Sequence, residues 1–418
     1  MAGADPNILH HGLVPAPKAL QLVLEDVEPV GSERIDLASA SNRVLAEDLK
    51  AKRTQPPFPA SAMDGYAIRH SDLIGNETVL NLIGETAAGH PFDGSVGKGE
   101  CIRIFTGAPV PDDCDTIIIQ ENVRADGDLI TILETADLGK FVRQAGLDFQ
   151  QGQTLLTRGT VLDPQSLSLA ASMNHPVVEV YQKPKIAIIA TGDELVLPGQ
   201  AAKSGQIIAS NTFGVAAIAA DAGAEVDNLG IALDTIEALQ QKISQALENG
   251  ADLIVTSGGA SVGDHDLVKP VMESFGFVFS FVKIAMRPGK PVIFGKAEIG
   301  GKTRRFFGLA GNPVSSLVSS HIYLRPLIRL LGGYPAQTVQ PVTAIFDCDL
   351  LANDEREDYM RGIARRGKNG EILVAPFPKQ DSSMLATLAK ADCLIIRAIK
   401  APSAKVGEAT QVIMLRDI

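Results

Sequence analysis

The chain has 418 residues and a formal net charge of −11 at pH 7. Hydrophobic residues make up 45% of it and charged residues 21%, so we expect packed cores rather than disorder. Its length suits about two to four domains. The acidic balance argues against general binding to nucleic acid or anionic membranes, although a local basic pocket could still hold a small anion.

The four cysteines, at positions 101, 114, 348 and 393, form no CxxC pair, so we expect neither a thiolate zinc site nor a disulfide scaffold. The first residues lack a basic region followed by an apolar core, which a secretory signal would need. The apolar stretches are far shorter than the ~20 residues of a membrane span. We therefore expect a cytoplasmic protein without membrane contact.

The first half of the chain changes character near residue 50. Apolar spacing predicts helix over 17–50, and the Pro-rich segment 54–59 ends it. Asp163 is expected to open another helix, and 125–128 reads as a hairpin turn. We expect a helical linker region (1–50 and 151–182) and an inserted β-rich domain (51–150). Its expected strands are 78–83, 101–105, 116–120 and 129–133.

From residue 183 strands and helices alternate, which predicts a mainly parallel sheet with helices on both faces over 183–333. Asn211 and Asp234 are the expected caps of two helices, and Glu237 stands at capping-box spacing from Asp234. A β-type domain is expected over 334–418. The expected strands are 185–190, 225–229, 253–256, 277–282, 291–294 and 305–309, with a long helix over 314–331.

Three turns between strands and helices in this region are rich in glycine or acidic residues, at 191–194, 256–266 and 308–316. In a parallel sheet all three lie on one edge, where ligands bind. Glycines let backbone approach a ligand, and amides at a helix N-terminus bind phosphate. The alternative is that each turn only connects a strand to a helix.

Charged residues accompany these turns. Carboxylates beside a phosphate site usually hold Mg²⁺, although Asp234 and Asp264 would also serve as simple helix caps. Arg287 and Lys290 flank a Pro-Gly turn and could grip an oxyanion, but taken alone they favour a solvated turn. The acidic residues of this edge are Asp193, Glu194, Asp234, Asp264 and Asp266.

Two catalytic motifs are matched only superficially. Residues 259–263 fit the G-x-S-x-G nucleophile elbow, but His265 is too close to be the usual partner and His321 lies in an apolar helical pattern. Residues 301–303 end like a phosphate-binding loop, but Lys296 stands where its first glycine belongs, so a hairpin is expected. No G-x-G-x-x-G follows the first strand, which gives no support to a dinucleotide site.

Six strings together resemble one family, the molybdopterin molybdenumtransferases of the MoeA type, which are related to the E domain of gephyrin. They are SAMDGYA at 61–67, IRIFTGAPVP at 102–111, ATGDEL at 190–195, SGGASVGDHD at 257–266, RPGKP at 287–291 and GNPVSS at 311–316.

The resemblance implies a multidomain α/β protein with a helical linker region, an inserted β-rich domain, a parallel-sheet molybdopterin-binding domain and a C-terminal β-barrel. It implies a homodimer with a shared active site, in which molybdate is inserted into adenylated molybdopterin with Mg²⁺ and AMP is released. Its further expected partners are a molybdopterin adenylyltransferase and the apoproteins of molybdenum enzymes, with no nucleic acid and no membrane.

The resemblance also assigns roles. Asp64, Thr106 and Asp148 would reach the partner's site from the inserted domain. Glu194, Asp234 and Asp266 would be the catalytic carboxylates and hold Mg²⁺. The expected pterin contacts are Gly258, Gly259, Ser261, Asn312 and Pro313, and the expected molybdate contacts are Arg287, Lys290, Arg361 and Ser383.

The chain departs from the family pattern at three places. Pro59-Ala60 replaces a Phe-Asp, Leu147 replaces a Glu, and Ala310 replaces a Pro. These changes leave a variant with altered metal, such as tungstate, as an alternative. An adenylyltransferase of the related fold is a further alternative, against which the inserted domain counts. A binding scaffold is another, against which the retained Asp64, Asp234 and Asp266 count.

Overall fold

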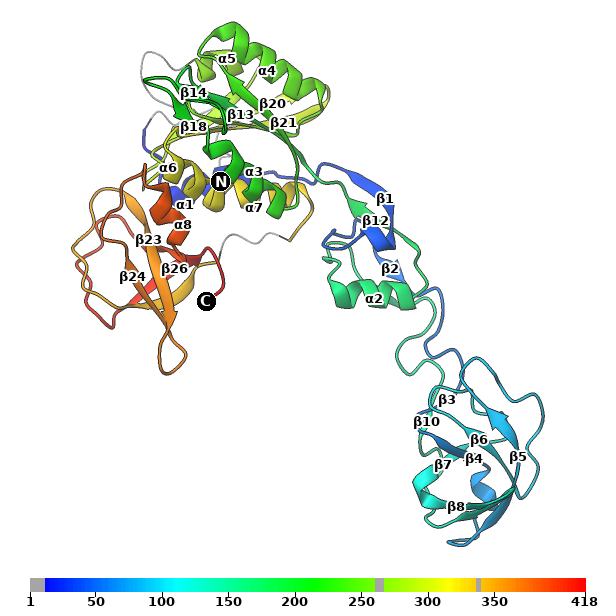
Figure 1. Cartoon of the computed structure of the whole chain (residues 1–418). Helices are drawn as coiled ribbons and strands as arrows, with labels where there is room; N and C mark the ends of the chain where they lie inside the picture. The colour runs from blue at the N-terminus through cyan, green and yellow to red at the C-terminus, as the bar shows by residue number, and fades with distance from the viewer. Residues whose placement is uncertain (1–11, 260–266, 336–339) are drawn as a thin grey trace, which may run out of the picture. The chain divides into compact units, whose positions relative to one another are not determined.

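The computed structural model describes residues 12–259, 267–335 and 340–418. Contacts divide the chain into two compact units (Figure 1). The first contains the described residues of 1–33, 42–46 and 180–418, and the second contains 34–41 and 47–179. No helix in these described ranges is long and apolar enough to cross a membrane.

The first unit is built on a six-stranded sheet in the order β16-β13-β17-β21-β20-β18. The first four strands run parallel to one another. β20 is antiparallel to β21, and β18 is antiparallel to β20, so the prediction of a mainly parallel sheet is confirmed. β20 and β21 meet in the hairpin expected at 301–303. The bounds are β13 (Lys185–Thr191), β16 (Glu225–Ala232), β17 (Leu253–Ser257), β18 (Val278–Lys283), β20 (Pro291–Ile299) and β21 (Lys302–Leu309).

Helices cover both faces of this sheet because its strands are apolar on both sides (Figure 1). Along β13, Ile186 and Ile188 pack into one core, while Ala187 and Ile189 pack into the other. Residues of α4 (Ile236–Glu248) and α5 (Val268–Ser274) join the second core. The first core contains residues of α1 (Ala16–Leu24), α3 (Asn211–Asp221), α6 (Pro313–Ser319), the π-helical η4 (Ser320–Leu324) and α7 (Arg325–Leu331).

Two cations of the sheet hold the carboxyl end of α1. Lys296 and Arg305 are paired across β20 and β21. Lys296 Nζ donates to the carbonyl of Glu25 at 2.9 Å, and Arg305 Nη2 to that of Asp26 at 3.4 Å. Positive charge near a helix C-terminus is favourable because the last carbonyls carry partial negative charge. Burial lowers the pKa of Lys296, which shows that the contact is partly withdrawn from water.

The helix expected over 17–50 is wrong beyond residue 24. After α1 the chain forms β1 (Ser32–Asp36), a short 3-10 turn and β2 (Leu49–Lys50). β1 pairs with β12 (Val177–Tyr181), and β2 pairs with β11 (Thr154–Leu156). These partners lie more than 100 residues along the chain, so local apolar spacing could not reveal them.

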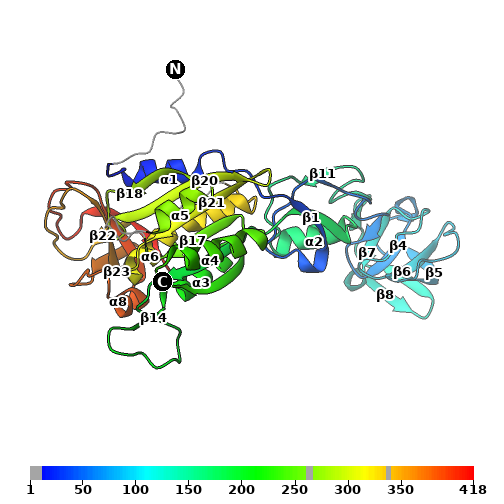
Figure 2. The same cartoon turned by 90° about the horizontal axis from the view of Figure 1, so that it is seen from above.

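The last part of the first unit is a closed β-barrel, as expected. Its strands follow the order β23-β24-β22-β26-β25, and β25 pairs back to β23. The barrel meets the sheet domain through β19 (Met286–Arg287), which pairs with β23, and through α8 (Leu385–Lys390), which lies against α6 (Figure 2). The bounds are β22 (Val342–Phe346), β23 (Glu357–Arg366), β24 (Ile372–Pro376), β25 (Cys393–Arg397) and β26 (Ala409–Met414).

The second unit contains a six-stranded sheet in the order β7-β4-β6-β5-β9-β8 and a short pair of β3 (Ala60–Ser61) with β10 (Val142–Arg143). Both faces of the sheet are buried, because Ile117 and Ile118 pack into different cores. The 125–128 hairpin joins β8 and β9 as predicted. The bounds are β4 (Gly65–Ile68), β5 (Val79–Thr86), β6 (Glu100–Ile104), β7 (Thr116–Ile119), β8 (Val123–Asp126) and β9 (Leu129–Ile132).

The two predicted caps with carboxylates had different outcomes. Asp163 caps α2 (Pro164–Ser172), where its Oδ1 accepts from the amide of Ser166 at 2.7 Å. Asp234 does not cap α4. Thr235 is the N-cap, and its Oγ1 accepts from the amide of Ala238 at 3.2 Å. The helix therefore begins one residue later than predicted, and the Asp234 carboxylate is available for other contacts.

We predict that Thr235→Ala lowers the free energy of unfolding by about 1 kcal/mol, because an α4 amide loses its cap. Asp234→Ala is the matched control and should change it by less than about 0.5 kcal/mol. Urea unfolding followed by circular dichroism measures both. A larger loss for Asp234→Ala than for Thr235→Ala would contradict this assignment of the cap.

Candidate functional site

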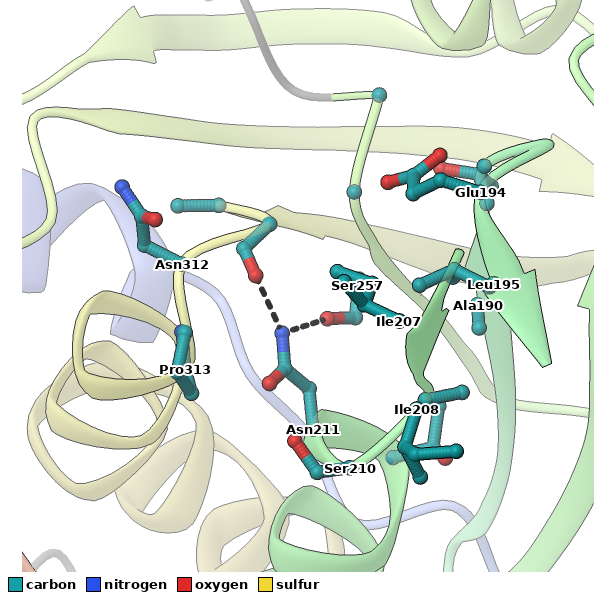
Figure 3. Close-up of a pocket in the computed structure, with 18 of the residues that line it drawn as sticks. Ala190, Glu194, Leu195, Ile207, Ile208, Ser210, Asn211, Ser257, Asn312 and Pro313 are labelled. Carbon is teal, nitrogen blue, oxygen red and sulfur yellow. Dashed lines mark hydrogen bonds between the residues drawn. The ribbon is translucent and has the colours of Figure 1, made fainter. Parts of the chain in front are cut away.

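A cavity of about 690 Å³ opens at the carboxyl ends of β13, β17 and β21 (Figure 3). Its wall includes residues from all three turns singled out in the sequence, so the prediction that they share one edge is confirmed. The lining also includes Ala190, Leu195, residues 207–212, Asp234, Pro291 and Ser383. A cavity of this size, at this edge of a parallel sheet, is where such folds bind small molecules.

Gly258 has a packing role as well as a place in the lining. Its φ is +101°, and a Cβ atom there would lie 2.4 Å from the carbonyl oxygen of Thr191. Its amide donates to the carbonyl of Leu309 at 3.1 Å. Any side chain would separate the neighbouring turns, so glycine is required here whether or not a ligand is bound.

The acidic edge is organised around a reciprocal contact between two aspartates. The amide of Asp234 donates to Asp193 Oδ1 at 3.0 Å, and the amide of Asp193 donates to Asp234 Oδ2 at 3.4 Å. Glu194 and Asp234 line the cavity (Figure 3 labels Glu194). The predicted residues Ser261, Asp264 and Asp266 lie outside the described residues.

These carboxylates suit Mg²⁺ only with help from a ligand. Within the described ranges, no group of three or more His, Cys, Asp or Glu side chains could hold a metal ion. Mg²⁺ is commonly held by one or two carboxylates together with water and substrate phosphates. Glu194 and Asp234 fit that pattern, since both carboxylates belong to the wall of a cavity large enough for a phosphorylated ligand.

The start of α6 forms another part of the wall. Asn312 is its N-cap residue but makes no side-chain capping bond, and Pro313 occupies the first helical position. Both line the cavity (Figure 3). The amide of Val314 donates to the carbonyl of Ser382 at 3.1 Å, which ties the barrel loop 380–384 to this helix. Ser383 thereby reaches the cavity.

Arg361 lies behind that loop. Its side chain is fully buried, with Nη1 donating to the carbonyl of Asp381 at 2.8 Å and Nε donating to Gln380 Oε1 at 3.2 Å. Ser383 Oγ donates to Asp381 Oδ1 at 2.6 Å. Arg361 thus contacts the loop that carries Ser383, and its side chain has no exposed surface in this structure.

The two cations of the RPGKP string differ. Arg287 forms ion pairs with Asp358 and Asp354; its Nε lies 2.8 Å from Asp358 Oδ1 and its Nη1 lies 2.8 Å from Asp354 Oδ2. Hydrogen bonds to Asp358 raise the pKa of Arg287, so it stays charged, but its charge is already balanced. Lys290 is exposed, and its ammonium has no hydrogen-bond or ion-pair partner in the described part of the chain.

In the second unit, the predicted site residues Asp64 and Thr106 are hydrogen-bonded to each other. Asp64 Oδ1 accepts from the Thr106 amide at 2.7 Å and from Thr106 Oγ1 at 2.8 Å. These bonds, assisted by the charge of Arg103, lower the pKa of Asp64. Asp148 is exposed, and within the described residues no hydrogen bond joins it to this pair.

Asn211 was missed as a site residue because it was expected to cap α3. Ser210 is the N-cap, without a side-chain capping bond. Asn211 Nδ2 donates to Ser257 Oγ at 3.0 Å and to the carbonyl of Gly311 at 2.7 Å (Figure 3). These partners lie 46 and 100 residues away in sequence, so no local signal could have found them.

An apolar part of the wall was also missed. β14 (Leu195–Val196) and β15 (Ile207–Ile208) form a short parallel pair beside the cavity. Ile207 and Ile208 line the cavity although they are 57% and 42% exposed. Exposed isoleucines beside a polar cavity are suited to contact a flat ring, but in the sequence they were only part of the interval between a strand and a helix.

Three family models match the chain in succession. The MoeA N-terminal region (domain I and II) matches residues 14–174. A probable molybdopterin binding domain matches 187–330, and the MoeA C-terminal region (domain IV) matches 343–415. With the sheet, the barrel and the cavity, these matches define a multidomain protein of the MoeA type.

Proteins of that type match nearly the whole chain. The molybdopterin molybdenumtransferase of Haemophilus influenzae is 38% identical over 382 residues, covering 91% of this chain and 93% of that protein. That of Bacillus subtilis is 29% identical over 414 residues, covering 97% and 94%. The crystal structure of a molybdopterin biosynthesis MoeA protein from Pyrococcus horikosii matches with a TM-score of 0.81 at 30% identity, covering 97% of this chain and 100% of that one. The chain belongs to the molybdopterin molybdenumtransferase family. Members of this family are transferases of molybdenum cofactor biosynthesis.

We predict that the pKa of Asp64 lies below the ordinary aspartate value and rises in Thr106→Val, which removes the hydroxyl donor but keeps the amide donor. Carboxyl NMR titration measures it. A lowered folded-state pKa stabilises the fold above the unfolded-state pKa, and this contribution disappears as the pH falls through the folded-state pKa.

Asp163 provides an internal control for that titration, because its pKa is also lowered, by bonds from Ser166 within the same unit. Its titration should not move in Thr106→Val. An unchanged Asp64 titration in that variant would show that the Thr106 hydroxyl does not hold the carboxylate.

Proposed function

We propose that this transferase inserts molybdate into adenylated molybdopterin with Mg²⁺, releasing AMP and molybdenum cofactor. The observation that carries the proposal is the cavity at the carboxyl edge, which combines three kinds of wall. Glycine turns bring the backbone to the cavity wall, Glu194 and Asp234 supply carboxylates, and Ile207 and Ile208 supply apolar surface. A phosphorylated molecule with a flat ring system needs all three.

Mg²⁺ would be held by Glu194 and Asp234, together with Asp266 from the segment outside the described residues. When bound, it would neutralise phosphate oxygens and ease departure of the nucleotide. The chain's own contribution is to orient the ligand. The Asp193–Asp234 contact fixes the turn that carries one carboxylate, and Gly258 lets the neighbouring turn lie close to it.

Molybdate would be held near Lys290, with Ser383 and Asn312 as hydrogen-bonding groups. Lys290 is the stronger candidate of the RPGKP pair, because Arg287 is already paired with Asp354 and Asp358. An oxyanion at Lys290 would gain an unbalanced positive charge, whereas at Arg287 it would have to displace a carboxylate. Pro291, the next residue, lines the cavity.

We further propose a cytoplasmic homodimer in which Asp64 and Thr106, with Asp148, complete the site of the partner subunit. The Asp64 carboxylate, fixed by Thr106, supports this proposal, since it caps no helix of its own unit and could serve a partner's site. An adenylyltransferase supplying the substrate and the apoproteins of molybdenum enzymes would be its further partners. Tungstate in place of molybdate is the second candidate reaction, motivated by Ala310, which departs from the family pattern and lines the cavity.

The direct test mixes the purified protein with adenylated molybdopterin and Mg²⁺, and follows AMP release with molybdate, with tungstate and with neither. We expect release that depends on molybdate, with metal retained on the pterin. Glu194→Gln and Asp234→Asn should each slow it by at least about tenfold and raise the Mg²⁺ concentration needed.

Asp126→Asn, in the exposed hairpin of the second unit, is the matched control and should react like the unaltered protein. Tight pterin binding with no AMP release under any of the three conditions would refute the transferase reaction and favour a binding scaffold. Release with tungstate alone would establish the altered-metal alternative.

The shared site predicts complementation between inactive variants. Asp64→Asn and Asp234→Asn place their changes in different units of the chain. In a mixed dimer, one of the two sites would then contain neither change. Co-expression of differently tagged chains, followed by isolation of the mixed dimer, should restore AMP release well above that of either pure variant. No gain in the mixed dimer would contradict the shared site.

A further inference from the structure

The amide group of Asn211 has one feature that the proposed reaction does not use. Both of its bonds run from Nδ2 to acceptors on the cavity wall, Ser257 Oγ and the Gly311 carbonyl (Figure 3). An amide NH₂ group has two protons and no acceptor capacity, so both protons are used here. Asn211 therefore binds a lone pair of Ser257 Oγ and one of the Gly311 carbonyl oxygen, two atoms of residues that line the cavity.

The consequence for Ser257 is a directed hydroxyl. Because Ser257 Oγ accepts from Asn211, its own proton must point elsewhere. The side chain is only 3% exposed, and within the described residues its hydroxyl has no other hydrogen-bond partner. Ser257 lines the cavity, so the free proton is available on that side. A buried hydroxyl proton without an acceptor is a costly group that an anionic oxygen would satisfy.

We infer that Asn211 is a positioning residue that sets the Ser257 hydroxyl as a donor to an anionic oxygen of the ligand. The inference rests on the proposed function, because the anion is taken to be a phosphate oxygen of adenylated molybdopterin.

A merely structural role would be to tie the β17 and β21 turns together. These turns already touch through the Gly258 amide, which donates to the Leu309 carbonyl at 3.1 Å. A tie would act through Gly311 and would not depend on the hydroxyl of Ser257. The two roles therefore differ in whether the effect of Asn211 passes through Ser257.

A double-mutant cycle on ligand binding separates them. The dissociation constant of adenylated molybdopterin is measured by equilibrium dialysis for the full-length protein, Asn211→Ala, Ser257→Ala and the double variant. We expect each single change to weaken binding by at least about tenfold, the effect of losing a hydrogen bond to a charged group. The dissociation constant of the double variant should be at most about twofold higher than that of Ser257→Ala, because Asn211 acts through that hydroxyl.

Asn249→Ala is the matched control. It also removes a side-chain amide bond, from Nδ2 to Asp227 Oδ2 at 2.7 Å, but it borders a different hollow, lined by Lys185 and Glu225 among others. Its dissociation constant should be unchanged. Thermal melting of every variant checks the fold. Should Asn211→Ala fail to fold, Asn211→Leu, which removes the same amide donor but keeps most of the volume, replaces it in the cycle.

The outcomes separate the positioning role of Asn211 from the proposed transferase reaction on which it rests. Unchanged binding in either single variant, or losses that multiply in the double variant, would overturn the positioning role while leaving the transferase intact. Failure of the unaltered protein to bind adenylated molybdopterin would refute the proposed function, and the inference with it.

Discussion

The parallel register of β13, β17 and β21 places Ala190, Ser257 and Leu309 side by side at the last step of the sheet. From that level three turns leave in the same direction, and the positions of Glu194, Gly258 and Asn312 at the cavity depend on it. A slip of one residue would exchange the two buried faces of a strand and turn its last side chain away from the cavity. Because Ile186 and Ile188 fill one core while Ala187 and Ile189 fill the other, packing on both faces opposes such a slip.

In the proposed reaction the cavity would receive anions in a chain whose net charge is −11. Side-chain cations would contribute less to the attraction of an anion than their number near the cavity implies. Arg287 is balanced by Asp354 and Asp358, and Arg361 is buried. The attraction therefore has to be local, from backbone amides at the turns, from oriented hydroxyl groups and from Lys290. Fixed dipoles suit this task because they need no reorganisation when the ligand arrives.

Patterns within one segment predicted much of this structure. The strands of the first unit are short, apolar and bounded by turn residues, so their presence and parallel arrangement followed from the sequence, as did the shared edge of the three turns. The failures have a non-local cause. Segment 32–36 was included in the helix predicted over 17–50, but it pairs with β12 more than 100 residues away. Asp234 and Thr235 are both good caps, and only the backbone decides between them. Asn211 carries no local sign of its partners at 257 and 311.

The docking of α1 has a consequence for synthesis of the chain. Tyr323, which packs in the same core as α1, is 307 residues beyond Ala16, the residue whose carbonyl accepts its hydroxyl at 3.5 Å. At ~5–20 residues per second, the helix emerges from the ribosome roughly 15–60 s before this partner. The second unit, residues 34–41 and 47–179, is complete well before then. Throughout this interval the apolar face of α1 lacks its packing partners on η4 and α7, so this core can close only after the last helices of the sheet domain have been made.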